Sequence, residues 1–370
     1  DLGGNQLSGE IPSEIGDLTN LTNLDLGGNQ LSGEIPSEIG NLDSLVHLDL
    51  SSNQLQGTIP AEIGALTNLS VWDDIICDPE GCVEFLGLDF SNNQLSGEIP
   101  SAIGNLDSLI YLDLSSNQLT GQVPPEIENL ANLIILNLSN NQLSGTLPDE
   151  IGGLENLREL FLYNNMINGE MPESIFDLKH LTSLNINHNV YLSGSLDNMI
   201  NLDSLIHFSI FNCNFSGSIP INIGNMIDLQ TLNLAYNQLS GQIPASIVNL
   251  KNIMFLNLAS NLLDGSIPED IGNLDNLTKF FSVWSNNLSG TIPASLGNLT
   301  NLEVLELAYN QFSGTIPEEI CNLRSSEFFS DIRLWDNEFC PPYPDCLISE
   351  GDEEFVDQQG DGLLQIGECL

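Results

Sequence analysis

The sequence of 370 residues predicts an α/β solenoid, in which short strands and helical turns alternate around one elongated core. The first observation is a fixed period: Gly9, Gly33 and Gly57 are 24 residues apart, and the same glycine recurs as far as Gly314. The second is the regular order of apolar and polar residues inside each period. A repeat of this length indicates stacked coils, because one such unit cannot bury its own apolar face.

Each repeat begins with a short strand. In the segment 21–26, Leu24 and Leu26 alternate with the polar residues Asn23 and Asp25. Alternation of this kind is typical of a strand with one buried face. Stacking of the repeats then places parallel strands side by side on the concave surface.

An asparagine stands three residues after each strand, as Asn29 does after Leu26. Its amide can satisfy backbone groups where the chain turns out of the strand, so we expect these asparagines to form a hydrogen-bonded ladder. Cys213 replaces the asparagine in one repeat, where we expect a small buried thiol.

The second half of the repeat contains a bend and a helical turn. Gly33 allows the backbone conformation of the bend, and Pro36 fixes its own φ and ends a short extended piece. Ile39 and Leu42 then lead back to the next strand. The copy at residues 189–197 is off by one residue and lacks the proline, which predicts a local bulge or kink.

The pattern LxxLxLxxNxLSGxIPxxIGxLxNL, present from Leu21 onward, resembles the plant-type leucine-rich repeat. The resemblance covers most of the chain. It implies a curved superhelix with a parallel concave β-sheet, short lateral strands at the SGxIP segment, and 3-10 or helical turns on the convex side. It also implies a binding role rather than catalysis.

We predict about 13 repeats over residues 1–320 and a disulfide-containing cap over residues 321–370. The glycine spacing widens to 40 residues between Gly57 and Gly97, which places an insertion near residues 70–84. Cys77 and Cys82 in this insertion are spaced for a small disulfide loop.

Four cysteines in the cap permit three pairings, among which the sequence does not choose. They are Cys321, Cys340, Cys346 and Cys369. Cysteine usage of this kind indicates an oxidising compartment, so we predict an extracellular or cell-surface protein.

The chain is strongly acidic, with 6 Lys and Arg against 51 Asp and Glu and a formal net charge of −45. This balance excludes binding to a nucleic-acid backbone, which requires a cationic surface. It also argues against anionic membranes. No apolar run is long enough for a transmembrane helix, so no membrane insertion is predicted.

Aromatic side chains map to the concave sheet or its flank in several repeats. Several exposed aromatics in register indicate a binding face, and the alternative is cross-strand packing that stabilises the sheet. The predicted ligand-binding residues are Phe161, Tyr163, Phe211, Tyr236, Trp284, Tyr309 and Trp335.

A column of carboxylates is predicted on four successive concave strands, at Asp25, Asp49, Asp89 and Asp113. Neighbours in such a column lie about 4.8 Å apart and repel each other, so either bound cations or raised pKa values are expected. Diffuse counter-ions are the favoured interpretation, because no ligand set with EF-hand spacing accompanies the column. We therefore predict no cofactor and no metal site, with calcium as the alternative.

The predicted function is non-enzymatic recognition or scaffolding, in which the concave face binds a protein, peptide or glycan. The four histidines have no accompanying nucleophile motif, so no catalytic residue is predicted. Two alternatives stay open. In the first, the uncapped coil around Leu2 and Leu7 contacts a second copy or an upstream segment. In the second, the lateral polar column that begins at Glu10 and Glu34 binds ice or another surface.

Overall fold

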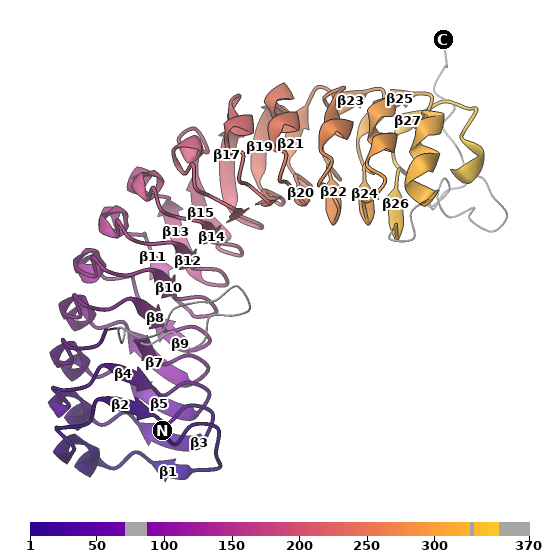
Figure 1. Cartoon of the computed structure of the whole chain (residues 1–370). Coiled ribbons are helices and arrows are strands. Elements are labelled where there is room, and N and C mark those ends of the chain that lie inside the picture. Colours follow the sequence, from indigo (N-terminus) through magenta and orange to yellow (C-terminus); the bar gives the residue numbers. More distant parts are fainter. Residues whose placement is uncertain (71–86, 326–328, 348–370) are drawn as a thin grey trace. The chain divides into compact units, whose positions relative to one another are not determined.

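The computed structural model describes residues 1–70, 87–325 and 329–347, and it confirms the solenoid (Figure 1). A typical repeat passes through a concave strand, a lateral strand and a 3-10 helix. The prediction of a repeat array with a parallel sheet and 3-10 turns is therefore confirmed. The predicted disulfide loop of Cys77 and Cys82 lies outside the described residues.

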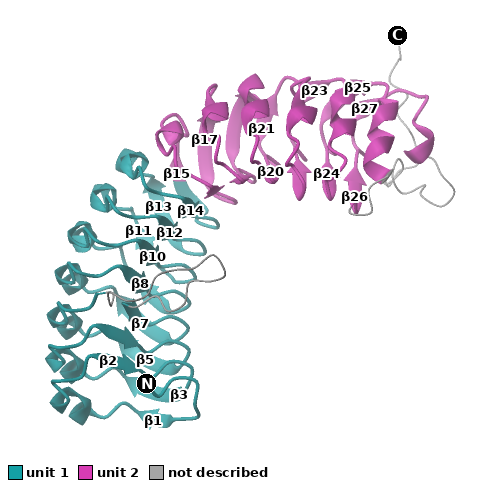
Figure 2. Cartoon of the chain, viewed as in Figure 1, with its two compact units in different colours: residues 1–192 teal, residues 193–370 magenta. Residues whose placement is uncertain are grey.

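The chain forms two compact units, Asp1–Leu192 and Ser193–Leu370 (Figure 2). The division falls inside the repeat whose sequence predicts a bulge or kink. The backbone N–H of Leu192 donates to the carbonyl of Asn189 at 2.9 Å, whereas that of Ile167, one repeat earlier, donates to the side-chain oxygen of Asn189 at 3.1 Å. The following repeat has Cys213 in place of the ladder asparagine. The irregular backbone thus coincides with a missing amide.

The concave strands pair in parallel with one another in each unit. In unit 1 they are β2 (Asn23–Asp25), β4 (His47–Asp49), β6 (Leu88–Asp89), β8 (Tyr111–Asp113), β10 (Ile135–Asn137), β12 (Glu159–Phe161) and β14 (Ser183–Asn185). In unit 2 they are β16 (His207–Ser209), β18 (Thr231–Asn233), β20 (Phe255–Asn257), β22 (Phe280–Ser282), β24 (Val304–Glu306) and β26 (Asp331–Arg333).

The lateral strands follow the asparagine ladder and also pair in parallel. Unit 1 contains β1 (Ser8–Glu10), β3 (Gln30–Glu34), β5 (Gln54–Thr58), β7 (Gln94–Glu98), β9 (Gln118–Thr120), β11 (Ser144–Gly145) and β13 (Met166–Glu170). β15 (Tyr191–Gly194) spans the division. Unit 2 contains β17 (Asn214–Ser218), β19 (Gln238–Gln242), β21 (Leu262–Asp264), β23 (Ser289–Gly290), β25 (Gln311–Gly314) and β27 (Glu338–Phe339).

Short 3-10 helices lead each repeat back to its next strand. In η2 (Ser37–Asn41), Pro36 has a φ of −67°, and its carbonyl accepts the N–H of Ile39 at 3.0 Å. The others are η1 (Ser13–Asp17), η3 (Ala61–Ala65), η4 (Ser101–Asn105), η5 (Pro125–Asn129), η6 (Asp149–Gly153), η7 (Glu173–Asp177), η8 (Met199–Asn201), η9 (Ile223–Asn225), η10 (Ala245–Asn249), η11 (Ile271–Asn273), η12 (Ala294–Asn298), η13 (Glu318–Ser325) and η14 (Asp345–Leu347).

The core is built from the apolar residues of the repeat pattern. Leu45, Leu48, Leu50 and Leu55 in one coil are all 0% exposed. Complete burial of a leucine side chain contributes about 1.5–3 kcal/mol relative to leaving it in water. Because each coil covers the apolar edge of the next, this contribution recurs along the array.

The asparagine ladder forms as the sequence predicts. The side-chain oxygen of Asn141 accepts the N–H of Leu119 from the preceding repeat at 3.0 Å. Its NH2 group donates to the carbonyls of Leu114, Leu138 and Ser139 at 2.9–3.2 Å. Each asparagine therefore joins two repeats. Cys213 is buried, as predicted, and its thiol donates to the carbonyl of Phe211 at 3.9 Å.

The structure chooses a pairing for two of the cap cysteines. Cys321 in η13 and Cys346 in η14 form a disulfide, and Cys340 is disulfide-bonded as well. Cys369 lies outside the described residues. β26 joins the concave sheet beyond residue 320, so strand pairing continues into the segment predicted as a cap.

Candidate ligand-binding surface

Four of the predicted residues form a continuous cluster of rings in unit 2, which we call the aromatic ridge: Phe211, Tyr236, Trp284 and Tyr309. The ring centroids are 5.1 Å apart for Phe211 and Tyr236, 6.3 Å for Tyr236 and Trp284, and 5.5 Å for Trp284 and Tyr309. Packed aromatic pairs of this kind contribute about 0.5–1.5 kcal/mol beyond their buried area. Tyr236 and Tyr309 are nevertheless 45% and 47% exposed, so the ridge offers ring surface to a ligand.

The repeat pattern explains how distant residues meet in the ridge. Phe211 and Trp284 come directly after the last core residue of the strand segment, and the two tyrosines come one position later. Tyr236 and Trp284 belong to repeats separated by one other. That intervening repeat has Ala259 and Ser260 at the two positions, so no large side chain stands between the rings.

The backbone of both ridge tyrosines is left-handed, with φ of 57° at Tyr236 and 56° at Tyr309. This conformation is uncommon outside glycine and is an outlier for a bulky side chain, at a cost on the order of 1 kcal/mol. Other repeats place residues such as Ser52, Asn92 and Asn140 here. Backbone preference therefore does not account for the tyrosines, which points to a use for their side chains.

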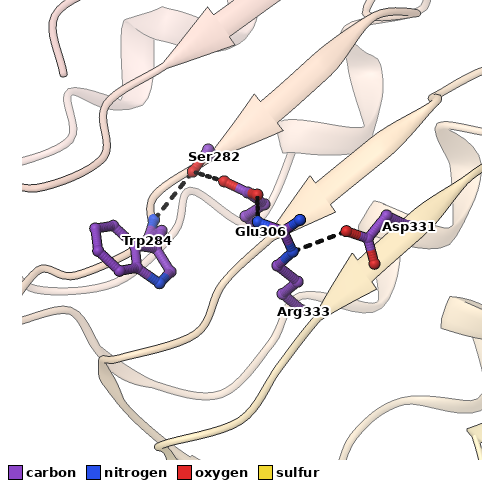
Figure 3. A network of polar contacts seen from close by, with 5 residues as sticks. All are labelled: Ser282, Trp284, Glu306, Asp331 and Arg333. Atoms are coloured by element: carbon purple, nitrogen blue, oxygen red, sulfur yellow. Dashed lines mark hydrogen bonds and ion pairs between the residues drawn. The ribbon is translucent and has the colours of Figure 1, made fainter. Parts of the chain in front are cut away.

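A polar network connects the ridge with the neighbouring strands (Figure 3). The hydroxyl of Ser282 accepts the backbone N–H of Trp284 at 3.3 Å and donates to the carboxylate of Glu306 at 3.0 Å. Glu306 forms an ion pair with Arg333, whose Nε lies 2.7 Å from Asp331. Ser282 is 0% exposed. The network thus fixes the backbone that carries the central ring of the ridge.

A second feature of unit 2 lies at the start of the concave strands β20 and β22. Phe255 and Phe280 stack with centroids 5.1 Å apart and an interplanar angle of 15°. Beside them is a hollow of about 490 Å³, lined by His207, Gln230, Thr231, Asn233, Met254, Phe255 and Lys279. Sequence reasoning did not find this hollow. The available signal was the pair of phenylalanines at the first position of adjacent strands.

The remaining predicted residues lie outside the four-ring cluster. Phe161 ends β12 and Tyr163 follows it, and both are half-buried in unit 1. Trp335 follows β26 in unit 2, and its carbonyl accepts the backbone N–H of Tyr309 at 3.1 Å. Trp335 is thus adjacent to the end of the ridge along the backbone.

The aspartate column forms on the concave sheet of unit 1. Asp25 is in register with Asp49, Asp49 with Asp89, and Asp89 with Asp113. Each carboxylate also accepts the backbone N–H two residues later, as Asp89 does from Ser91 at 2.8 Å. Burial raises the pKa of Asp89 to about 6, and the charges of Asp113 and Asp49 add to this effect.

The column has a clear structural role, because its hydrogen bonds hold the turn that leaves each strand. The carboxylate of Asp113 also accepts the hydroxyl of Tyr111 at 3.1 Å and the amide of Asn137 at 2.8 Å. Across residues 1–70, 87–325 and 329–347, no group of three or more His, Cys, Asp or Glu is arranged to hold a metal ion.

Family comparisons cover most of the array. The "Leucine-rich repeat region" model matches residues 211–326, and one "Leucine rich repeat" model matches residues 132–190. Another leucine-rich repeat model matches residues 20–42, 44–66, 86–106 and 108–130. A search of curated proteins finds no match. Within the described part of the chain, no helix has the length and apolar character needed to cross a membrane.

Solved structures give the same assignment. The ectodomain of the Arabidopsis receptor kinase HAESA, in complex with an extended IDA peptide hormone, is 32% identical with a TM-score of 0.86 over 96% of this chain and 56% of that one. The TDR receptor is 34% identical with a TM-score of 0.83, over 94% and 57%. This chain therefore spans little more than half of these two receptor chains.

A leucine-rich repeat protein of Leptospira interrogans is similar over more of its own length. It is 32% identical with a TM-score of 0.67, and the match covers 88% of this chain and 75% of that one. Repeat pattern, strand register, asparagine ladder and these similarities all agree, and the chain belongs to the leucine-rich repeat family.

Proposed function

We propose that this chain is a non-enzymatic recognition module of the extracellular or cell-surface space, and that its concave side binds a peptide or an extended protein segment. The aromatic ridge of unit 2 is the proposed centre of the site. Trp335 extends it within unit 2. Phe161 and Tyr163 are proposed as a separate contact surface of unit 1.

The observation that carries this proposal is the pair of tyrosines in left-handed backbone. Tyr236 and Tyr309 occupy positions where asparagine would fold at lower cost, and both keep nearly half of their surface exposed. Exposed, rigid aromatic rings supply large contact area with little loss of conformational entropy on binding. A selective advantage in binding explains why such residues stand there.

The similar structures support a peptide ligand. The HAESA ectodomain, which shares this fold and 32% identity, is described in complex with a peptide hormone. A parallel sheet built from one strand per repeat also suits an extended ligand, because equivalent positions recur at about 4.8 Å along it.

Selection of peptides from a displayed random library against the full chain tests the proposal. We expect binders whose affinity falls at least tenfold in the double variant Tyr236→Asn/Tyr309→Asn. Asparagine removes the rings and suits the left-handed backbone, as Asn140 does in unit 1, so the fold should be retained.

Tyr191→Asn is the matched control. Tyr191 is 66% exposed on the lateral strand β15 and lies away from the ridge in the repeat pattern. Selected peptides should bind this variant as they bind the unchanged chain. Peptides that bind equally to the double variant and the control would place the site elsewhere.

A further inference from the structure

We infer that the peptide received by the aromatic ridge is cationic, with arginine or lysine side chains that lie against the rings of Tyr236, Trp284 and Tyr309. The inference rests on the proposed function and specifies the chemistry of its ligand. It follows from how the charges beside the ridge are already paired.

The cations beside the ridge are held by carboxylates of the chain itself. Arg333 is paired with both Glu306 and Asp331, and Lys279 Nζ, next to the start of β22 and beside the hollow, lies 2.6 Å from Glu303. Two cations therefore face three carboxylates, which leaves one negative charge in this group. The other basic residues described in unit 2 are also engaged: Lys251 donates to the carbonyl of Asn273, and Arg324 to that of Cys346.

The carboxylates are connected directly to the ridge. Glu306 reaches the backbone of Trp284 through a single hydroxyl, that of Ser282 (Figure 3). Its side chain is 12% exposed, against 32% for Asp331. A ligand on the rings of Trp284 and Tyr309 thus lies beside strands whose charged groups are net negative. Negative charge near an aromatic face strengthens the attraction of that face for a cation.

An acidic ligand meets two obstacles at this surface. To pair with Arg333, its carboxylate must either displace Glu306 or Asp331 or join them as a third negative charge around one cation. It must also approach a chain with a net charge of −45, which repels anions and attracts cations. A cationic peptide meets neither obstacle, because both the rings and the surrounding field favour it.

Three synthetic peptides test the inference on the full chain. The first has arginines at alternate positions in a Gly/Ser sequence, the second replaces them with the neutral isostere citrulline, and the third with glutamate. We expect the arginine peptide to bind at least tenfold more tightly than the citrulline peptide. The double variant Tyr236→Asn/Tyr309→Asn should remove about tenfold of this affinity, and the control Tyr191→Asn should not.

Substitution of Arg333 separates the two ligand chemistries. Arg333→Gln removes a cation and leaves Glu306 and Asp331 without it, so the arginine peptide should bind about threefold more tightly or better. Asp331→Asn, in the opposite sense, should weaken it by a similar factor. Loss of arginine-peptide binding in Arg333→Gln, with the fold intact by circular dichroism, would overturn the inference. A glutamate peptide that binds the unchanged chain and loses its affinity in Arg333→Gln would also overturn it and favour an acidic ligand.

The ridge variant, Tyr236→Asn/Tyr309→Asn, distinguishes failure of the cationic ligand from failure of the proposed function. If the citrulline or glutamate peptide binds as well as the arginine peptide and remains sensitive to the ridge variant, the proposed function stands and the cationic ligand is wrong. If the arginine peptide binds and is insensitive to the ridge variant, its attraction is diffuse and the inference fails. If the ridge variant affects no peptide, including those selected from the library, both are wrong.

Discussion

At the scale of single residues, Tyr236 and Tyr309 show that a repeat pattern predicts the position of a residue better than its backbone conformation. The sequence predicts correctly that both stand beside the concave sheet, because the asparagine that follows each fixes the register. It does not predict their left-handed backbone, which the structure shows at the same position of other repeats as well, for example at Ser52, Asn92 and Asn140. The strain is thus a property of the aligned column.

Asp89 provides a prediction on pH. Its folded pKa of about 6 lies above the ordinary value of 3.8 for an aspartate, so between these values the folded state binds the proton more strongly. Stability from this group is present below about pH 4 and is lost as the pH rises through 6. Asp89→Asn should therefore raise the free energy of unfolding by at least about 1 kcal/mol at pH 7. At pH 5 the increase should be about 1 kcal/mol smaller than at pH 7, because Asp89 is then mostly protonated in the folded state.

Urea unfolding of both proteins at pH 7 and pH 5 measures this difference, and the comparison cancels the titration of the other carboxylates. Asparagine is a suitable replacement, because Asn137 occupies the same column and accepts the N–H of Ser139 at 3.2 Å. A difference that does not change with pH would show that the proton of Asp89 is not linked to folding.

At the scale of elements, the asparagine ladder should be the most sensitive part of the repeat. Asn141→Ala removes the acceptor of the Leu119 N–H and the donor to three carbonyls, all of them buried. The three carbonyls keep other donors, which are Asn117, Asn165 and Ser116, so the Leu119 N–H is the group left without a partner. An unsatisfied buried backbone group costs about 1–3 kcal/mol, so we expect a loss of about 1–3 kcal/mol in the free energy of unfolding.

The matched control for the ladder is Asn156→Ala. Asn156 makes a single, exposed hydrogen bond to the carbonyl of Ala131, and its loss should cost less than about 1 kcal/mol. Guanidinium unfolding of the two variants checks the difference. Equal losses would mean that water replaces the ladder amide without penalty.

The elements also show which parts of the site follow from the sequence. The strand register follows from the sequence, because the period assigns every residue to a column. The aspartate column therefore forms as predicted. Contacts between side chains of different repeats do not follow from the sequence. The meeting of Tyr236 with Trp284 depends on the small Ala259 and Ser260 between them, and the stack of Phe255 on Phe280 depends on side-chain orientation. The pairing of Cys321 with Cys346 likewise depends on three-dimensional proximity, which the sequence does not give.

At the scale of the whole molecule, the net charge of −45 should make stability depend on salt. Screening at about 0.1 M ionic strength reduces repulsion beyond about 10 Å, and charges spread over the repeats lie within and beyond that range. We expect the midpoint of thermal unfolding to rise by several degrees between about 10 mM and about 500 mM NaCl.

Calcium chloride at matched ionic strength serves as the comparison in the same melts. An equal rise in both salts is expected from diffuse counter-ions. A distinctly larger rise in calcium would show a bound ion and support the alternative of a calcium site. A midpoint independent of salt would show that the acidic side chains are too well separated to repel each other.

Cys213 gives the chain an internal reporter. Among the described cysteines it is the one outside a disulfide, it is buried, and it interrupts the asparagine ladder in the repeat that follows the division at Leu192. Because Cys213 is only 9% exposed, we expect a bulky thiol-specific reagent to react with it mainly when that coil opens. The alkylation rate of the native protein, corrected with Cys213→Asn, therefore gives the free energy of local opening. Cys213 thus reports how easily the coil next to the division at Leu192 opens in the folded protein.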